Sequence, residues 1–107
     1  MKLIFRDDEI PEASSQAVGA AIQEVEADET LTLEKSDSAF LDAFGLVGGL
    51  FSVQYREGGV EDIWVAPGEG VDRAMLCRLF LSYLAGDEAW RTLVAWEANP
   101  EHGSAFT

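Results

Sequence analysis

The fold is decided by the stretch from Leu50 to Ala85, LFSVQYREGGVEDIWVAPGEGVDRAMLCRLFLSYLA. Its opening residues alternate, which places Phe51, Val53 and Tyr55 on one side of an extended chain and polar residues on the other. The Glu-Gly-Gly sequence that follows favours a tight turn, because glycine adopts positive φ at little steric cost. This part of the chain therefore predicts a half-buried strand that enters a hairpin.

The hairpin is expected to return through Val60 to Ala66, and Pro67 ends that strand. Val71 to Ala85 then spaces its large apolar residues so that only a narrow polar stripe remains, which predicts a largely buried helix. Gly86 suits the left-handed C-cap of such a helix. A hairpin followed by a buried helix is typical of an α+β domain.

The residues before this stretch predict a strand, a helix and a second strand. Lys2 to Arg6 alternates as a short strand does, and the apolar residues after Pro11 recur at helical intervals. Thr30 to Leu33 alternates again and is rich in β-favouring residues. We expect a short helix or turn over Ser38 to Leu46, because its apolar residues suit one helical face while Gly45, Gly48 and Gly49 forbid a long helix.

The C-terminal part completes the expected architecture. Arg91 to Trp96 reads as a final short strand, and residues 99–107 as a flexible tail. We therefore expect a single α+β domain over residues 1–98, with an antiparallel-rich sheet of about five strands packed by two main helices. The expected order is strand, helix, strand, short helix, hairpin, helix, strand.

The composition is that of an acidic but folded chain. It has 107 residues, with 20 acidic against 7 basic residues and a formal net charge of -13. Aromatic and aliphatic residues run through the whole length, so the acidity belongs to the surface of a packed domain. Cys77 is the only cysteine, which excludes an intramolecular disulfide. Without a signal-peptide core or a membrane-length apolar run, the sequence predicts a cytoplasmic protein that does not bind membranes.

Catalytic and cofactor motifs are not found in the sequence. His102 is the only histidine and lies in the expected tail, so a histidine-dependent nucleophile would lack a rigidly held base. The acids lack the spacing of a calcium loop, and the glycines lack that of a phosphate-binding loop. We expect no enzyme activity, no metal and no cofactor. The scattered basic residues also argue against direct nucleic-acid binding.

Carboxylates gather in three clusters that flank predicted turns and element ends. The clusters are Asp7, Asp8, Glu9 and Glu12; Glu24, Glu26, Asp28 and Glu29; and Glu57, Glu61 and Asp62. Their total charge exceeds the magnitude of about 2–8 that solubility of a small domain needs. Because acidic surfaces speed encounter with basic partners, we expect one of these clusters to bind a protein.

The hairpin turn is the predicted contact. Glu57, Glu61 and Asp62 would pair with basic side chains of the partner, with Trp64 or Tyr55 as the apolar anchor. Trp64 faces away from Ile63 and Val65 in the expected strand, so its alternative place is the core on the helix-covered side.

Residues 66–98 resemble the C-terminal part of a bacterial family of immunity proteins from polymorphic toxin systems, the family numbered first in that classification. The resemblance rests on Pro67 and Gly68 in a turn, Phe80 and Leu81 late in a helix, Gly86 at a break, and Trp96 with Glu97 at the end. It implies a bacterial antidote that binds a toxin, often a deaminase or nuclease.

The function expected from these observations is that of an acidic immunity or antitoxin protein. It would occlude the basic active-site face of a cognate toxin, a nucleic-acid-modifying enzyme, as a monomer or weak homodimer. A DNA-mimic or phage-type inhibitor of a nucleic-acid machine is one alternative, and it predicts rows of carboxylates on one face. A small structural or dimeric adaptor, and an enzyme with paired carboxylates in a concave pocket, are the others.

Overall fold

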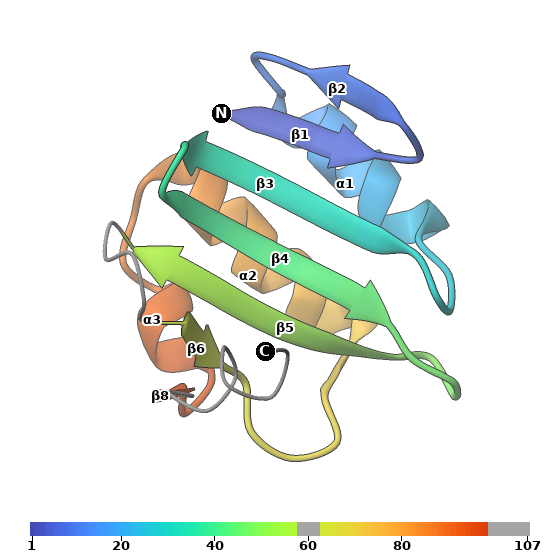
Figure 1. The fold of residues 1–107 in the computed structure, drawn as a ribbon, viewed down its shortest axis with the longest axis vertical. Coiled ribbons are helices and arrows are strands. Elements are labelled where there is room, and N and C mark those ends of the chain that lie inside the picture. Colours follow the sequence, from blue (N-terminus) through green and yellow to red (C-terminus); the bar gives the residue numbers. More distant parts are fainter. Residues whose placement is uncertain (58–62, 99–107) are drawn as a thin grey trace, which may run out of the picture.

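The computed structural model describes residues 1–57 and 63–98. Within these ranges the chain forms eight strands and three helices (Figure 1). The strands are β1 (Lys2–Phe5), β2 (Asp8–Ile10), β3 (Thr30–Ser36), β4 (Ala39–Gly45), β5 (Leu50–Glu57), β6 (Ile63–Val65), β7 (Val71–Asp72) and β8 (Glu97–Ala98). The helices are α1 (Ser15–Glu24), α2 (Arg73–Ala85) and α3 (Trp90–Leu93). The predicted α+β class is confirmed, with more strands than expected.

The strands form one antiparallel sheet in the order β2-β1-β3-β4-β5-β6-β8, with β7 paired to the start of β5. The long strands β3, β4 and β5 lie at its centre, and the short β2 and β8 form its edges (Figure 1). Thr30 lies opposite Phe44, and Ala39 lies opposite Glu57, so these residues mark the two ends of the central strands.

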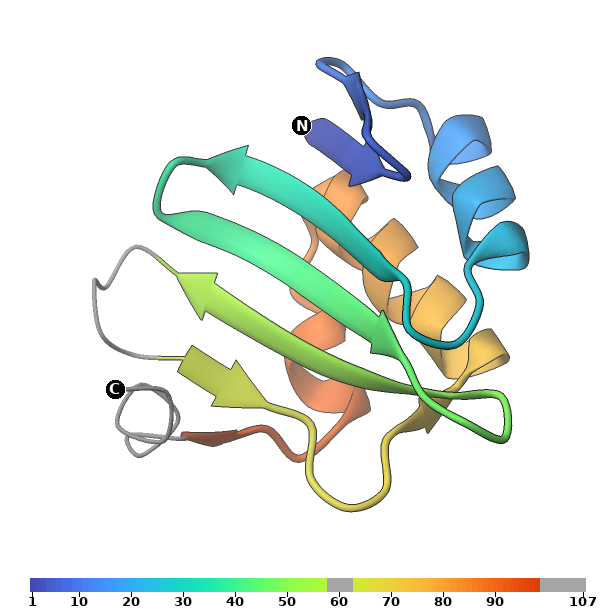
Figure 2. The same cartoon turned by 45° about the vertical axis from the view of Figure 1, so that its right-hand side comes forward.

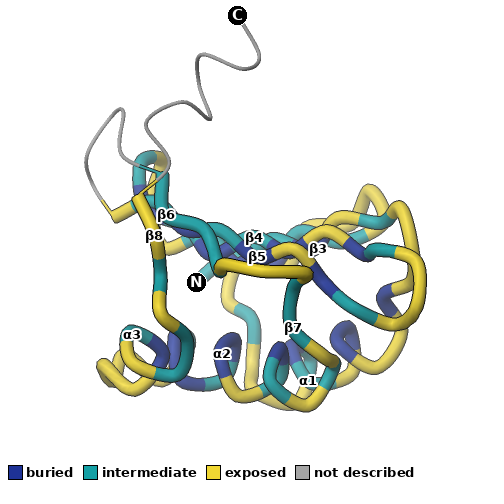
Figure 3. The backbone as a smooth tube through the Cα atoms, turned by 90° about the horizontal axis from the view of Figure 1, so that it is seen from below, coloured by how far each residue is buried: buried dark blue, intermediate teal, exposed yellow. Residues whose placement is uncertain are grey.

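The helices all lie on one face of the sheet, which leaves the other face uncovered (Figure 3). Alternate residues of the central strands point toward the helices, and they are buried between the sheet and the helix layer. These inner residues are Leu31, Leu33, Leu41, Ala43, Phe51, Val53 and Tyr55. The core is therefore a single layer between sheet and helices.

The two long helices begin at side-chain caps. Ser14 Oγ accepts a hydrogen bond from the Ala17 amide at 3.1 Å, and Asp72 Oδ1 accepts one from the Met75 amide at 2.8 Å. Such caps satisfy amides that have no partner within the helix. Helix α2 ends at Gly86, whose φ of 80° is the predicted left-handed C-cap. In Figure 2, α2 runs behind the central strands, and α1 lies beside the N-terminal strands.

The short helix or turn predicted over Ser38 to Leu46 is wrong. Most of this segment is β4, with Leu41 facing the helices and Phe40 and Phe44 on the uncovered face. Apolar residues on both faces of a strand hide the alternation that would identify it. The spacing of Phe40, Leu41 and Phe44 in the sequence then matches that of one face of a helix.

The strand predicted over Arg91 to Trp96 is also wrong, because α3 occupies Trp90–Leu93 and β8 only Glu97–Ala98. Trp90 is buried among aromatic rings, and Trp96 Nε1 donates to its carbonyl oxygen at 3.0 Å. This packing overrides the β-favouring composition of the segment. The expected tail over 99–107 and residues 58–62 of the hairpin lie outside the described residues.

Candidate functional site

The predicted anchors Tyr55 and Trp64 lie on the helix-covered side of the sheet. Tyr55 is only 7% exposed, and its ring packs edge-on against Trp90 and Trp96 at centroid distances of 4.7 and 4.8 Å. Trp64 is half-buried and stacks on Tyr55, with the ring centroids 6.2 Å apart. The structure thus does not support Tyr55 as a surface anchor, and Trp64 takes the alternative place expected for it.

Glu57, the first predicted contact residue, is paired with cations of its own chain. Arg91 Nη2 donates to Glu57 Oε1 at 2.7 Å, and Lys35 Nζ lies 3.9 Å from the same oxygen. Arg91 also binds Glu88. We call Lys35, Glu57, Glu88 and Arg91 the Arg91 end of the sheet, where the charges largely cancel. Glu61 and Asp62, the other predicted contacts, lie outside the described residues.

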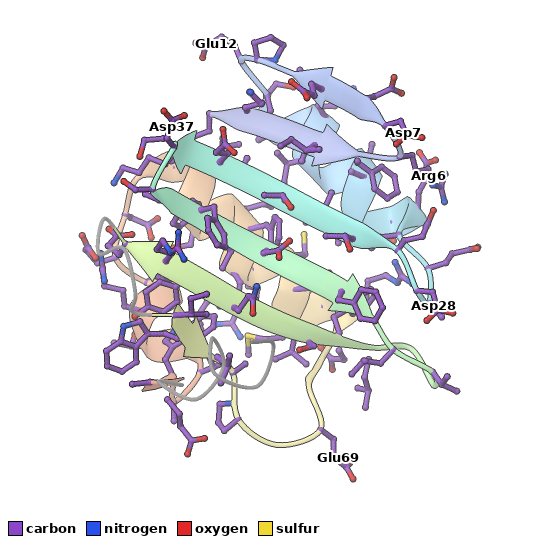
Figure 4. The ribbon with its side chains drawn as sticks, viewed as in Figure 1. Arg6, Asp7, Glu12, Asp28, Asp37 and Glu69 are labelled. Carbon is purple, nitrogen blue, oxygen red and sulfur yellow. The ribbon has the colours of Figure 1, made fainter. Side chains whose placement is uncertain are left out.

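The opposite end of the sheet brings together two of the acidic clusters that are separate in the sequence. We call it the acidic end, and it consists of Arg6, Asp7, Asp8, Glu24, Glu26, Asp28 and Glu29. Six carboxylates and one guanidinium give it a formal charge of -5. Figure 4 shows Arg6, Asp7 and Asp28 at this end of the sheet, with Glu12 and Asp37 at the other.

Arg6 joins the two clusters. Its Nε and Nη2 donate to the two oxygens of Glu29 at 2.7 and 3.0 Å, and Nη2 also donates to the Glu24 carbonyl at 2.9 Å. Bidentate pairing of this kind fixes geometry as well as charge. The hydrogen bond from Arg6 lowers the pKa of the Glu29 carboxyl, assisted by the bond from the Glu26 amide. The β1–β2 turn is therefore clamped to the loop between α1 and β3.

The backbone at the acidic end is held in conformations that L-residues rarely adopt. Arg6 and Asp7 form the two-residue turn between β1 and β2 with φ of 52° and 69°, and Asp28 has φ of 68°. Turns of this geometry usually carry asparagine or glycine. Strained backbone costs about 1–3 kcal/mol per residue and is often found at functional sites. Two of these three strained residues, Asp7 and Asp28, carry carboxylates of the acidic end.

Close backbone contact holds the α1–β3 loop against the end of β4. The Asp28 amide donates to the Gly45 carbonyl at 2.8 Å, and the Gly45 amide donates to the Glu29 carbonyl at 2.9 Å. A Cβ atom on Gly45 would lie 2.0 Å from the Glu26 carbonyl oxygen, so only glycine allows this approach. The carboxylates of the loop are thereby presented from a fixed backbone.

The C-terminus of α1 lies at the acidic end, and the negative pole of its dipole is offset by two arginines. Its last carbonyls carry the negative pole of the helix dipole. Arg73, from α2, donates to the carbonyls of Ile22 and Val25, the latter at 2.9 Å, while Arg6 binds that of Glu24. Two arginines are thus used within the chain to satisfy the helix end, and neither neutralises Asp7, Asp8 or Asp28.

Apolar side chains are exposed at the same end of the sheet as these carboxylates. Phe44, at the end of β4, is 41% exposed, and Val47, at the tip of the β4–β5 turn, is 90% exposed. Phe44 neighbours Gly45, against which the acidic loop packs. Apolar anchors surrounded by charged groups are typical of protein-binding surfaces. The sequence does not reveal Phe44 as an exposed residue, because the apolar spacing of Ser38 to Leu46 predicts a helical face for it.

A polar row crosses the uncovered face of the sheet. Thr32 Oγ1 donates to Asp42 Oδ1 at 2.8 Å, and Gln54 Nε2 donates to Asp42 Oδ2 at 3.3 Å. Burial raises the pKa of the Asp42 carboxyl, although both hydrogen bonds oppose the change. Its hydrogen-bonded partners are neutral, so the row joins β3, β4 and β5 and does not form the two-carboxylate arrangement of a glycosidase.

Neither a metal centre nor a membrane segment is found among the described residues. No group of three or more histidine, cysteine, aspartate or glutamate side chains over 1–57 and 63–98 could hold a metal ion. The helices in these same ranges are too short or too polar to cross a bilayer. Comparison of the chain with protein-family models, curated proteins and solved structures finds no significant match in any of the three.

Proposed function

We propose that this protein is an acidic inhibitor of the immunity or antitoxin type, which binds the basic active-site face of a cognate toxin. The toxin is a nucleic-acid-modifying enzyme, whose substrate groove is basic because it must hold phosphates. The acidic end is the contact surface. The observation that carries the proposal is the convergence of six carboxylates with one internal cation on a rigid backbone.

The physical basis is the pre-organisation of charge. Asp7 and Asp28 are fixed by backbone geometry, and Glu29 is held by Arg6, so docking costs little ordering of the surface. Basic side chains of the toxin would pair with the carboxylates, while Phe44 and Val47 would pack against apolar groups beside the groove. The bound protein would then exclude nucleic acid from the toxin by occupying its site.

This proposal moves the contact away from the hairpin turn predicted from the sequence. At the Arg91 end, Glu57 already has two cations of its own chain within ion-pair distance. A carboxylate paired in this way gains less binding free energy from a partner's lysine or arginine. At the acidic end, Asp7, Asp8, Glu26 and Asp28 have no ion-pair partner among the described residues.

The DNA-mimic alternative is less well supported. It predicts a row of carboxylates on one face of the sheet. At the centre of the uncovered face, Asp42 is flanked across the strands by Thr32 and Gln54. Nothing in this row resembles the regular spacing of phosphates.

The test is co-expression with the product of the neighbouring gene. The neighbour is expected to be toxic alone and harmless with this protein. The triple variant Asp7→Asn, Glu26→Gln, Asp28→Asn is expected to lose protection and to bind at least about tenfold more weakly, with binding of the wild type falling as salt rises.

A matched control removes the same charge elsewhere. Glu12, Asp37 and Glu69 are exposed and lie away from Asp7 and Asp28 (Figure 4). The triple variant Glu12→Gln, Asp37→Asn, Glu69→Gln should therefore keep full protection. A harmless neighbour, or one that does not bind at low salt, would refute the proposed function. Equal loss in both triple variants would refute the acidic end as the site.

A further inference from the structure

An apolar groove lies between the β1–β2 hairpin and α1, next to the acidic end. Its volume is about 370 Å³, within the range of pockets that hold ligand groups. Phe5 and Ile10 line the side formed by the strands, and Ala17, Ala20 and Ala21 line the side formed by the helix. Ile10 is 41% exposed although it lies on the helix-covered side of the sheet.

The groove exists because alanine side chains are too short to reach the edge strand. β2 is only three residues long and forms the outer edge of the sheet, so no further strand covers it within the described residues. The space is large enough for one or two aliphatic side chains from outside. Exposed apolar surface of this kind is usually covered by a partner.

The charges at the mouth indicate the chemistry of that partner. Asp8 and Glu24 line the groove together with Arg6. The Arg6 guanidinium is already bound to the Glu29 carboxylate and to both the carbonyl and the carboxylate of Glu24. Asp8 has no ion-pair partner among the described residues, so it is the acid at the mouth that is open to a cation from outside. A segment that enters here must carry apolar side chains for the groove and cations for its rim.

We propose that the groove receives the apolar face of a basic amphipathic helix of the partner protein. This inference rests on the proposed function, since it describes the segment of the toxin that contacts the acidic end. A leucine-type side chain would lie between Ile10 and Ala20, and a lysine or arginine on the same helix would pair with Asp8. Docking of a helix in an apolar groove is a common mode of peptide recognition.

The test uses three synthetic peptides of about 18 residues, long enough to form a helix. One repeats leucine and lysine at helical spacing, one has serine in place of leucine, and one has glutamine in place of lysine. Each is titrated into the full ¹⁵N-labelled chain at low salt. The leucine–lysine peptide should shift the amides of Ile10, Ala17 and Ala20 and bind at least about tenfold more tightly than the other two.

Two leucine variants isolate the groove without changing the charge. Ala20→Leu fills it and should weaken the leucine–lysine peptide about tenfold, while the serine–lysine peptide is unaffected. Ala74→Leu makes the same change at an exposed position of α2 and should alter neither affinity. The amide spectrum of each free variant checks that the fold is kept.

The outcomes separate this inference from the proposed function. Equal affinity for the leucine–lysine and serine–lysine peptides, or shifts confined to the acidic end, would overturn the groove as a site. Equal affinity for the glutamine peptide would overturn the requirement for a basic partner segment. If the peptides do not bind the groove but the neighbouring toxin is still neutralised through the acidic end, the groove inference is refuted and the proposed function is retained. A groove that binds while the neighbour proves harmless would support the inference and refute that function.

Discussion

The two ends of the sheet differ in their balance of charge: the Arg91 end has two acids and two cations, whereas the acidic end has six acids and one cation. At the Arg91 end, Lys35 and Arg91 pair with Glu57, and Arg91 also pairs with Glu88. At the acidic end, Arg6 pairs with Glu24 and Glu29, and the other four carboxylates have no ion-pair partner among the described residues. A carboxylate cluster in the sequence therefore does not predict an acidic surface, because residues far along the chain decide which clusters are neutralised.

The largest expected effect is at the glycine that supports the acidic end. Gly45→Ala places a methyl group against the Glu26 carbonyl, which cannot move without breaking the loop. We expect a loss of about 3 kcal/mol in the free energy of unfolding, measured by urea denaturation. Gly19→Ala is the control, since nothing lies within 4 Å of its added Cβ. It should gain about 0.5–1 kcal/mol from helix propensity. Equal changes would mean that the loop is not held by this contact.

A smaller loss is expected at Ser82 of α2, which binds the backbone of Trp90 next to Arg91. Ser82 Oγ donates to Asp87 and accepts a hydrogen bond from the Trp90 amide at 2.9 Å. Ser82→Ala leaves that buried amide without a partner, which should cost about 2 kcal/mol. Ser52→Ala, on the exposed face of β5, should stay within about 0.5 kcal/mol of the wild type. In the co-expression test Ser82→Ala should still protect, and loss of protection would remove the functional contrast between the two ends.

Asp7→Gly should stabilise the chain while weakening the proposed contact. Relief of the positive φ outweighs the added freedom of the unfolded chain, for a net gain of about 1 kcal/mol. Asp37→Gly removes the same charge from a turn where the residue does not have positive φ. It should instead lose about 0.5–1 kcal/mol. A loss of stability in both variants would show that the strain at Asp7 is already compensated.

The smallest effect is a pH dependence at the acidic end. The pKa of Glu29 is lower in the folded chain than its ordinary value of 4.5, so the carboxylate contributes stability above that pH. The contribution is lost as pH falls through the folded pKa. Thermal unfolding should therefore show a lower Tm for Glu29→Gln at pH 7, with the difference vanishing in acid. Glu69→Gln should match the wild type throughout, and a pH-independent difference for Glu29→Gln would contradict the role of Arg6.

Much of the fold could be predicted because its pattern is local. The alternation of β5 and the apolar spacing of α2 identify these elements directly, and their burial follows from the same pattern. β4 was not predicted as a strand, because Phe40 and Phe44 make its outer face apolar as well. The three-residue β2 was not predicted as a strand, because its residues include two acids and are followed by Pro11.

The candidate site could be predicted only in part. The acidic clusters around Asp7 and Asp28 are visible in the sequence. No local sequence pattern, however, predicts that the two clusters lie side by side in the fold. Their meeting depends on Arg6, which binds residues 18 and 23 positions away. Likewise, Arg91 neutralises Glu57 across 34 positions. Pairings over such distances are set by the topology of the sheet, which periodicity does not reveal.

The one-sided cover of the sheet has a consequence during synthesis. The strands pair in nearly the order in which the ribosome releases them, but α2 follows all three central strands. Until Leu76, Leu79 and Phe80 have emerged, the inner faces of β3, β4 and β5 have no α2 to cover them. A nascent chain that pauses before α2 exposes an apolar sheet to its neighbours, and such surfaces aggregate. We therefore expect a pause in translation between residues 50 and 80 to lower the yield of folded protein.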